Sequence, residues 1–284
     1  MLIVCPTPIG NMDDATPRQR QALAGADIIA CEDTRRAGKL LELLGIERVD
    51  GHPELWRYDD HTGREQAEAL ADRVEAGQTV VLTTDAGTPT ISDPGYRLVR
   101  ACRRRGLEVT ALAGPVAAVV ALSASGLATD RFVFEGFLPT SSSKRRERLE
   151  RLEKMSLTSV AYESPRRIVD ALSDVEAVFG AQARVCVARE LTKLHEEYVV
   201  GPVAEVREEL AQRDGLRGEF VLCIEAQAAE ESDDAGWEEA DRLIEVLNAQ
   251  GLRSRTIKEV VDEICDVPRS QIYGRIEQIS ADDD

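Results

Sequence analysis

Short apolar runs alternate with amphipathic segments through the N-terminal part of the chain. β-Branched and other apolar residues predict strands at residues 2–5, 27–31, 55–58, 79–83 and 107–112. Apolar residues at three- and four-residue spacing predict helices at 17–24, around 40–44, 64–76 and 96–105. Strands that alternate with helices in this way indicate a mostly parallel sheet with crossover helices.

The next part of the chain also reads as α/β, with more strands per residue. Strands are predicted at residues 131–137, 158–163, 184–188 and 219–225, with helices at 113–126 and 203–212. A basic helix follows residue 140, and its segment 144–151, considered alone, is typical of a solvent-exposed face. Several candidate hairpins favour a mixed sheet, so the fold class is α/β with two α/β domains.

The C-terminal part begins with the acidic stretch AQAAEESDDAG, which predicts a linker. Three short helices follow at residues 238–249, 254–265 and 269–279, and Ile257, Val261 and Ile264 share one face of the second. This pattern resembles a helix-turn-helix unit, although three-helix modules are also common packing units. We therefore divide the chain into two α/β domains at 1–113 and 114–226, an acidic linker at 227–236 and a helical module at 237–284.

Composition limits the cellular setting and the chemistry. The formal net charge is −17, which argues against a general nucleic-acid coating protein, because phosphate binding requires local positive charge. We expect a cytoplasmic protein, because no apolar run is long enough for a bilayer and no basic segment precedes the first apolar run. The six cysteines form no CxxC pair and the three histidines are scattered, so we expect buried free thiols and no metal site.

Three polar loops follow predicted strands and therefore mark the candidate site. They are PTPIGN, EDTRR and TTDAGTPTISDPG, and the carboxyl ends of parallel strands are where ligands bind in open α/β sheets. The chain contains neither GxxxxGK[ST] nor GxGxxG, so a P-loop NTPase or an ordinary dinucleotide site is not indicated. Asp85 has no neighbouring lysine, which favours a cationic or nucleoside-like ligand over a polyphosphate. An ordinary strand-to-helix connection is the alternative for any one of these loops.

Basic side chains lie apart from these carboxylates in the sequence. They suggest a track for an RNA backbone on an otherwise acidic protein, with solvated helix faces as the alternative. The candidates are Arg35, Arg36, Arg166, Arg167 and Arg189.

Eight motifs occur in an order that resembles a known family. They are PTPIGN, DIIACEDTR, TDAGTPTISDPGYRLVR, AGPVAA, FEGFLP, YESPRR, ARELTKLHEE and GEFVLCIE. Together they resemble the small-subunit ribosomal RNA methyltransferase I family, a branch of the tetrapyrrole methylase (class III methyltransferase) superfamily. The resemblance implies a homodimer that binds S-adenosylmethionine in a cleft between two α/β domains. It implies methylation of the 2′-hydroxyl of a cytidine ribose in the decoding centre of 16S ribosomal RNA, within the small subunit.

The resemblance also assigns residues to roles. The cofactor-binding positions that match the motifs are Ile9, Asp85, Thr88, Val116, Ala117 and Tyr162. We expect Ile9, Asp85 and Val116 to meet at one hollow. The N-terminal loop lacks the glycine-rich GxGPG form of the tetrapyrrole branch, which counts against a porphyrin or corrin substrate.

Methyl transfer to a ribose oxygen requires alignment of three atoms and a base for the hydroxyl proton. The candidate catalytic residues are Glu190, Lys193 and Asp33, with Glu163 as a further candidate. Two alternatives stay open at this point. One is a small-molecule, tetrapyrrole-like methylase of the same superfamily, and the other is a nucleic-acid-binding regulator that uses the C-terminal helices.

Overall fold

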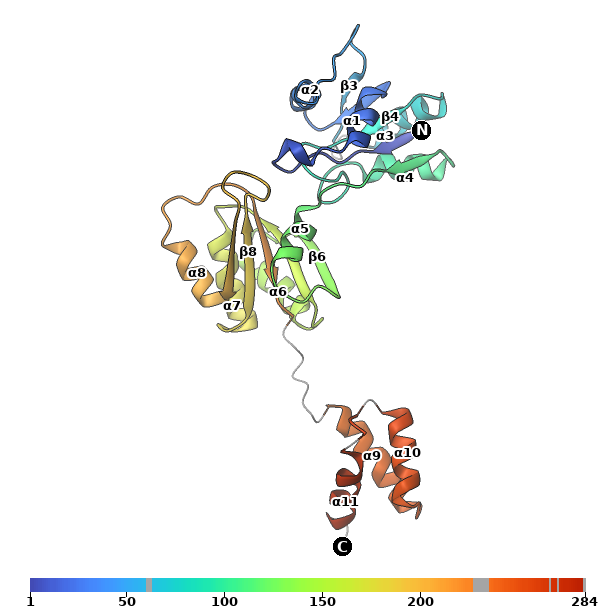
Figure 1. Ribbon diagram of the computed structural model, residues 1–284, viewed down its shortest axis with the longest axis vertical. Coiled ribbons are helices and arrows are strands. Elements are labelled where there is room, and N and C mark those ends of the chain that lie inside the picture. Colours follow the sequence, from blue (N-terminus) through green and yellow to red (C-terminus); the bar gives the residue numbers. More distant parts are fainter. Residues whose placement is uncertain (60–62, 227–234, 266, 270, 283–284) are drawn as a thin grey trace. The chain divides into compact units, whose positions relative to one another are not determined.

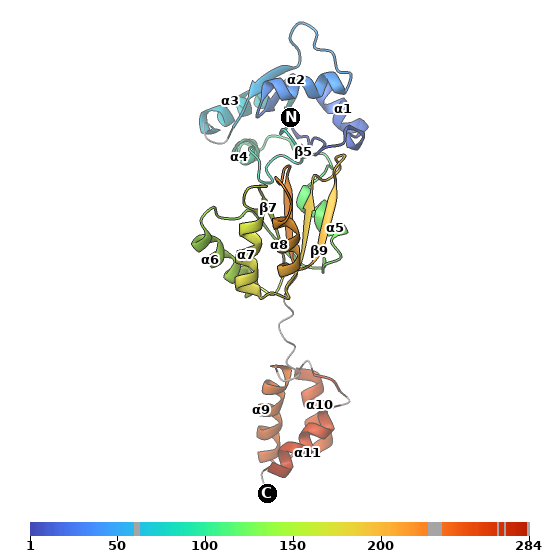
Figure 2. The same cartoon turned by 90° about the vertical axis from the view of Figure 1, so that its left-hand side faces the viewer.

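The computed structural model describes residues 1–59, 63–226, 235–265, 267–269 and 271–282. The chain divides into two compact units, Met1–Ala226 and Gln227–Asp284. Within the described residues, the first unit contains two five-stranded sheets with helices packed on them (Figures 1 and 2).

The first sheet is parallel throughout its described strand pairs. Its strands are β1 (Leu2–Val4), β2 (Ile28–Cys31), β3 (Glu54–Arg57), β4 (Val80–Leu82) and β5 (Val109–Ala111). They lie in the order β3-β2-β4-β1-β5, and the helices are η1 (Met12–Asp14), α1 (Pro17–Ala24), α2 (Thr34–Leu43), α3 (Gly63–Glu75) and α4 (Tyr96–Arg104). The parallel sheet with crossover helices is therefore as predicted.

Alternate side chains of each strand bury on opposite faces of this sheet. Ile28 of β2 belongs to the core that includes α3 and α4, whereas its neighbour Ile29 belongs to the core that includes α1 and α2. Leu2 of β1 lies in the first of these cores. Because both faces are covered, these strands appear in the sequence as continuous apolar runs.

The second sheet is mixed, as the fold prediction has it. Its strands are β6 (Phe132–Phe137), β7 (Thr158–Glu163), β8 (Arg184–Arg189), β9 (Glu197–Pro202) and β10 (Phe220–Ile224), in the order β6-β7-β10-β8-β9. β6 and β7 pair in parallel, and the other pairs are antiparallel. The helices are α5 (Ala117–Ala124), α6 (Ser142–Glu153), α7 (Ile168–Phe179) and α8 (Val203–Ala211). Helix α5 packs on one face, and α6, α7 and α8 pack on the other.

Helix α6 presents most of its basic residues to solvent, as interpreted from the sequence, with Arg145 as the exception. Arg145 is only 3% exposed and forms a buried ion pair with Asp174 of α7, with 2.6 Å between Nη2 and Oδ2. The partner lies on the next helix, so the sequence of α6 alone does not reveal this pairing.

The C-terminal unit contains α9 (Ala235–Ala249), α10 (Ser254–Ile264) and α11 (Ile272–Asp282). These helices enclose their own core, which includes Trp237, Ile244, Ile257 and Val261. Ile264 was expected on the same face as Ile257, but it is exposed, and the adjacent Cys265 is buried instead. Residues 227–234 of the predicted linker lie outside the described residues.

All six cysteines are buried free thiols, in agreement with the sequence-based expectation. Among the helices that the structure describes, none is long and apolar enough to cross a membrane.

Candidate functional site

The loops after β1, β2 and β4 meet the second sheet around one cavity of about 340 Å³. Parallel strands place their carboxyl ends at one edge, which brings these loops together. All six predicted cofactor-binding residues line this cavity: Ile9, Asp85, Thr88, Val116, Ala117 and Tyr162. Ile9, Asp85 and Val116 thus meet at one hollow, as expected. That they bind a cofactor remains a prediction.

Direct hydrogen bonds connect the loops that line the cavity. The backbone N–H of Thr7 donates to the Gly87 carbonyl at 2.9 Å, and the Gly87 N–H donates to the Thr7 carbonyl at 3.0 Å. The Thr88 hydroxyl donates to the carbonyl of Pro115 at 2.9 Å, which joins the loop after β4 to the start of α5. The cavity wall is therefore built from backbone segments tied together before any ligand arrives.

One wall of the cavity is largely apolar. Tyr162 at the end of β7 lies edge-on to Phe134 and Phe137, with ring centroids 5.0 and 5.6 Å away. Its hydroxyl accepts the N–H of Ala118 at 3.3 Å, and burial raises the pKa of Tyr162. Val116 and Tyr162 also pack against the core beneath α5. Such a wall suits the flat, apolar part of a ligand.

The facing wall is acidic. Asp85 forms an ion pair with Arg36 at 2.8 Å, and both residues line the cavity. Two further lining carboxylates, Glu32 and Asp93, were within the loops marked from the sequence but were not singled out there. The signal was present in the EDTRR and SDPG segments, but sequence reasoning gave no means of choosing among their residues.

Burial and neighbouring charge perturb Asp93. The Thr84 hydroxyl donates to Oε1 of Glu32, and the Asp93 carboxyl lies close to both of these side chains. Desolvation, followed by the negative charge of Glu32, raises the pKa of Asp93 to about 6. A carboxyl group with such a pKa exchanges its proton close to neutral pH.

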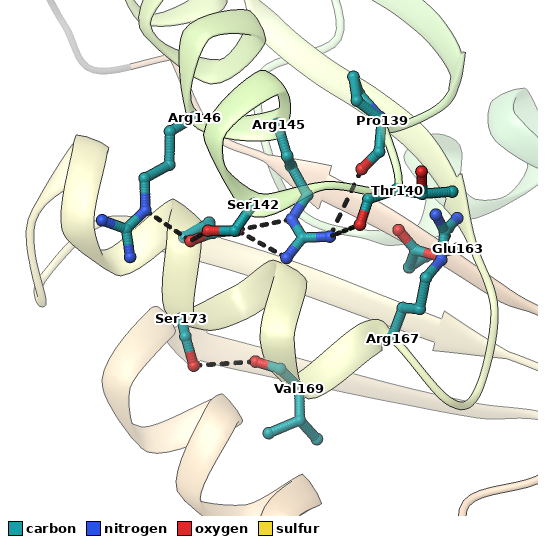
Figure 3. A network of polar contacts seen from close by, with 10 residues as sticks. Pro139, Thr140, Ser142, Arg145, Arg146, Glu163, Arg167, Val169 and Ser173 are labelled. Carbon is teal, nitrogen blue, oxygen red and sulfur yellow. Dashed lines mark hydrogen bonds and ion pairs between the residues drawn. The ribbon is translucent and has the colours of Figure 1, made fainter.

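Glu163 contributes a buried oxygen without a partner. The residue is 2% exposed, and its Oε1 accepts the backbone N–H of Ser164 at 2.7 Å and the Arg167 guanidinium at 2.6 Å (Figure 3). Oε2 has no hydrogen-bond partner among the described residues, and Glu163 lines the cavity. Arg167 Nη1 is likewise buried without a hydrogen-bond partner among the described residues, so this ion pair leaves hydrogen-bonding capacity unused beside the cavity.

The predicted catalytic residues Glu190 and Lys193 lie on the loop after β8 and are absent from the cavity lining. Lys193 Nζ is 2.8 Å from Glu190 and 3.0 Å from the cavity-lining Glu219. The hydrogen bond from Lys193 lowers the pKa of Glu190. Burial would lower the pKa of Lys193, but its hydrogen bonds to Glu190 and Glu219 outweigh burial and raise it. A base role for either residue remains a prediction.

The loop after β8 packs against the loop after β1 of the first sheet. The Asn11 N–H donates to Thr192 Oγ1 at 3.1 Å. A Cβ atom at Gly10 would lie 2.4 Å from Cγ of Lys193, so only glycine permits this approach. The contact gives Lys193 a structural role.

Asp33, the third predicted catalytic residue, caps the N-terminus of α2. Its carboxylate accepts the backbone N–H of Arg35 at 2.8 Å and pairs with the guanidinium of that residue at 2.9 Å. The hydrogen bonds from Arg35 hold the pKa of Asp33 well below its ordinary value. Asp33 does not line the cavity, and its proposed role as a base also remains a prediction.

Three of the five predicted RNA-binding arginines are exposed, and the other two are partly buried and contact other residues of the protein. Arg35 and Arg166 are exposed, and Arg36 is exposed at the cavity. Arg167 pairs with Glu163, and Arg189 donates to the carbonyl of Arg217 at 2.8 Å. No group of three or more potential metal ligands occurs among the residues described.

Comparison with known proteins gives consistent matches over nearly the whole chain. The sequence model of the tetrapyrrole (corrin/porphyrin) methylases matches residues 1–207. The chain is 41% identical over 273 residues to the ribosomal RNA small subunit methyltransferase I of Escherichia coli O157:H7, covering 96% of this chain and 93% of that protein. It is 38% identical to the protein of the same name from Synechocystis sp., covering 99% of both.

Solved structures support the fold. Diphthine synthase superposes with a TM-score of 0.62 at 14% identity, covering 80% of this chain and 90% of that chain. The methyltransferase CobJ superposes with a TM-score of 0.59 at 19% identity, covering 80% and 94%.

Proposed function

Since the chain belongs to the tetrapyrrole (corrin/porphyrin) methylase family, we propose that it transfers a methyl group from S-adenosylmethionine to ribosomal RNA of the small subunit. The acceptor in this proposal is the 2′-hydroxyl of a cytidine ribose in 16S ribosomal RNA. Relatives named ribosomal RNA small subunit methyltransferase I align over nearly the full chain, C-terminal helices included. The observation that carries the proposal is the convergence of all six predicted cofactor residues on one cavity.

The cavity has the size and chemistry that the methyl donor requires. Its volume of about 340 Å³ falls within the range of small-molecule sites, about 300–1,000 Å³. Tyr162, Val116 and Ala117 offer an apolar surface, and Asp85 offers a carboxylate for hydroxyl or ammonium donors. Oε2 of Glu163 is a buried acceptor with no hydrogen-bond partner within the part of the chain that the structure describes. When bound, S-adenosylmethionine would supply an activated methyl group on a positively charged sulfur.

The contribution of the protein is mainly alignment. The hydrogen bonds between Thr7 and Gly87, and from Thr88 to Pro115, fix the walls against which donor and acceptor must lie. Correct placement of the reacting atoms can supply about 7–11 kcal/mol of the barrier reduction. The hydrogen-bonded loops of the site serve this alignment.

The proposed RNA contact uses a local positive surface on an acidic protein. Arg36 lies at the cavity and Arg35 is 90% exposed beside it, so both suit phosphates that flank the target ribose. Arg166 is a further exposed candidate. We further propose that the protein is a cytoplasmic homodimer. Exposed apolar side chains such as Leu194 and Tyr96 are available for contact between its subunits.

Two measurements test the proposal. Calorimetry should show micromolar binding of S-adenosylmethionine, and absence of binding would favour a nucleic-acid-binding regulator instead. Purified small ribosomal subunits lacking the modification should gain one 2′-O-methylcytidine on incubation with enzyme and donor, as measured by nucleoside analysis. Donor binding without transfer to RNA would favour a small-molecule acceptor.

A further inference from the structure

The loops after β2 and β4 bring two carboxyl groups together at the cavity. Glu32 and Asp93 are far apart in the sequence, yet both line the cavity, and they lie close enough for the negative charge of Glu32 to raise the pKa of Asp93. Thr84, which is 4% exposed, links them and donates its hydroxyl to Glu32. The pair thus lies on the surface that faces a bound ligand.

Thr84 provides no hydrogen that could lie between the Glu32 and Asp93 carboxylates. A threonine hydroxyl has a single hydrogen, and that hydrogen is directed to Glu32. Two ionised carboxylates close to each other repel, so uptake of one proton by the pair relieves that repulsion. Thr90 and Ser92, just before Asp93, both adopt positive φ, at 76° and 62°. The backbone therefore holds Asp93 in this position at a local conformational cost.

A third carboxylate, from the second sheet, lies at the same cavity. Glu163, on β7, lines the cavity with a fully buried side chain, and its Oε2 has no hydrogen-bond partner in the described structure. This atom belongs to a different sheet from Glu32 and Asp93. A ligand that contacts Glu163 from within the cavity therefore lies in the space that the carboxyl pair also faces.

We propose that the Glu32–Asp93 pair is the proton acceptor for the hydroxyl group that becomes methylated, with Asp93 taking the proton. This inference rests on the proposed function and assigns the base to residues other than Glu190, Lys193 and Asp33. As the hydroxyl O–H bond breaks, its proton moves to the Asp93 carboxylate and is shared with Glu32. The acceptor oxygen bonds to the methyl carbon while the carbon–sulfur bond breaks and its electron pair stays on sulfur. The proton is later released to solvent.

The electrostatic surroundings favour this role near neutral pH. Burial and the charges of Glu32 and Asp85 raise the pKa of Asp93 to about 6, so Asp93 is largely ionised at pH 7.5 yet more basic than an ordinary aspartate. Arg36 also lines the cavity, where it is exposed and paired with Asp85. The other titratable groups that line the cavity are Tyr162, Glu163 and Glu219.

A titration of the full-length protein without donor or RNA tests the pair directly. Carbon-13 NMR of the carboxyl groups should reveal one aspartate with a midpoint near pH 6 that is absent in Asp93→Asn. Glu32→Gln removes the neighbouring charge and should move that midpoint toward the ordinary aspartate value of about 3.9. Absence of any carboxyl midpoint above about 5 would overturn the pairing. So would a midpoint unchanged by Glu32→Gln.

Kinetics then test the catalytic role. Asp93→Asn should lower kcat about 10²–10⁴-fold while donor affinity by calorimetry changes little. Glu32→Gln should shift the acidic limb of the pH profile downward. Asp130→Asn, a matched change at an exposed position outside the cavity lining, should leave kcat unaltered. Full activity in folded Asp93→Asn would overturn the inference, whereas a wild-type protein that titrates as expected but methylates no RNA would overturn the proposed function alone.

Discussion

Replacing Asp174 with asparagine should strongly destabilise the first unit. Asp174 accepts hydrogen bonds from Ser142 Oγ at 2.8 Å, Arg145 Nε at 2.7 Å and Arg146 Nε at 2.6 Å. Figure 3 labels these three donor residues. The side chains of Arg145 and Asp174 are 4% and 3% exposed. After the substitution, Arg145 keeps its charge but loses its counter-ion. The amide oxygen of asparagine can still accept a hydrogen bond but carries no charge, and the longer contacts to the carbonyls of Pro139 and Thr140, at 3.4 and 3.5 Å, would remain.

The expected loss in the free energy of unfolding is about 3–5 kcal/mol, the cost of leaving one partner of a buried ion pair alone. Asparagine matches aspartate in size, so no cavity term is added. Arg146→Met removes only the half-exposed partner and should cost about 1 kcal/mol or less. Combining Asp174→Asn with Arg145→Met removes the unpaired charge and should recover part of the stability that Asp174→Asn loses.

Urea unfolding followed by circular dichroism measures these differences, and the separate core of α9–α11 provides an internal reference. Burial would raise the pKa of Asp174, but hydrogen bonds from Arg146, Ser142 and Arg145 outweigh burial and hold the pKa below its ordinary value of 3.8. The stabilisation is therefore fully present above that value and is lost as pH falls through the folded-state pKa. A loss under 1 kcal/mol for Asp174→Asn at pH 7 would refute this account.

Three further predictions concern the site and the C-terminal unit. Asp85→Ala should weaken binding of S-adenosylmethionine about 10- to 100-fold by calorimetry, because a charged acceptor is lost, and unchanged affinity would remove Asp85 from the site. Gly10→Ala should lower the free energy of unfolding of the first unit by about 1–3 kcal/mol in urea, because its Cβ would lie 2.4 Å from Cγ of Lys193. Wild-type stability would show that the two loops move apart without cost. Removal of residues 235–284 should leave donor affinity unchanged while weakening binding to small ribosomal subunits in a filter assay, and retained RNA binding would exclude a docking role for the helices.

Much of the fold follows from local sequence pattern. Continuous apolar runs such as residues 27–31 predicted strands covered on both faces, and the helix starting at Pro17 begins where proline favours a first turn. β9 was not predicted because it is an edge strand in which Val199 is buried and Val200 is exposed, a weak pattern over a short length. Its hydrogen bonds to β8 decide its conformation.

The positions of the site loops could be predicted from the sequence, but the pairing of their charged side chains could not. Parallel strands must end at one edge, so the sequence alone determined that PTPIGN, EDTRR and TTDAGTPTISDPG would meet, and with the family motifs it indicated Ile9 and Tyr162. Only the tertiary structure decided which charged side chains face the cavity and which pair elsewhere. Glu32 meets Asp93 there, whereas Asp33 turns to Arg35. Charge pairing depends on distances of a few ångströms between distant segments, and no local periodicity encodes those distances.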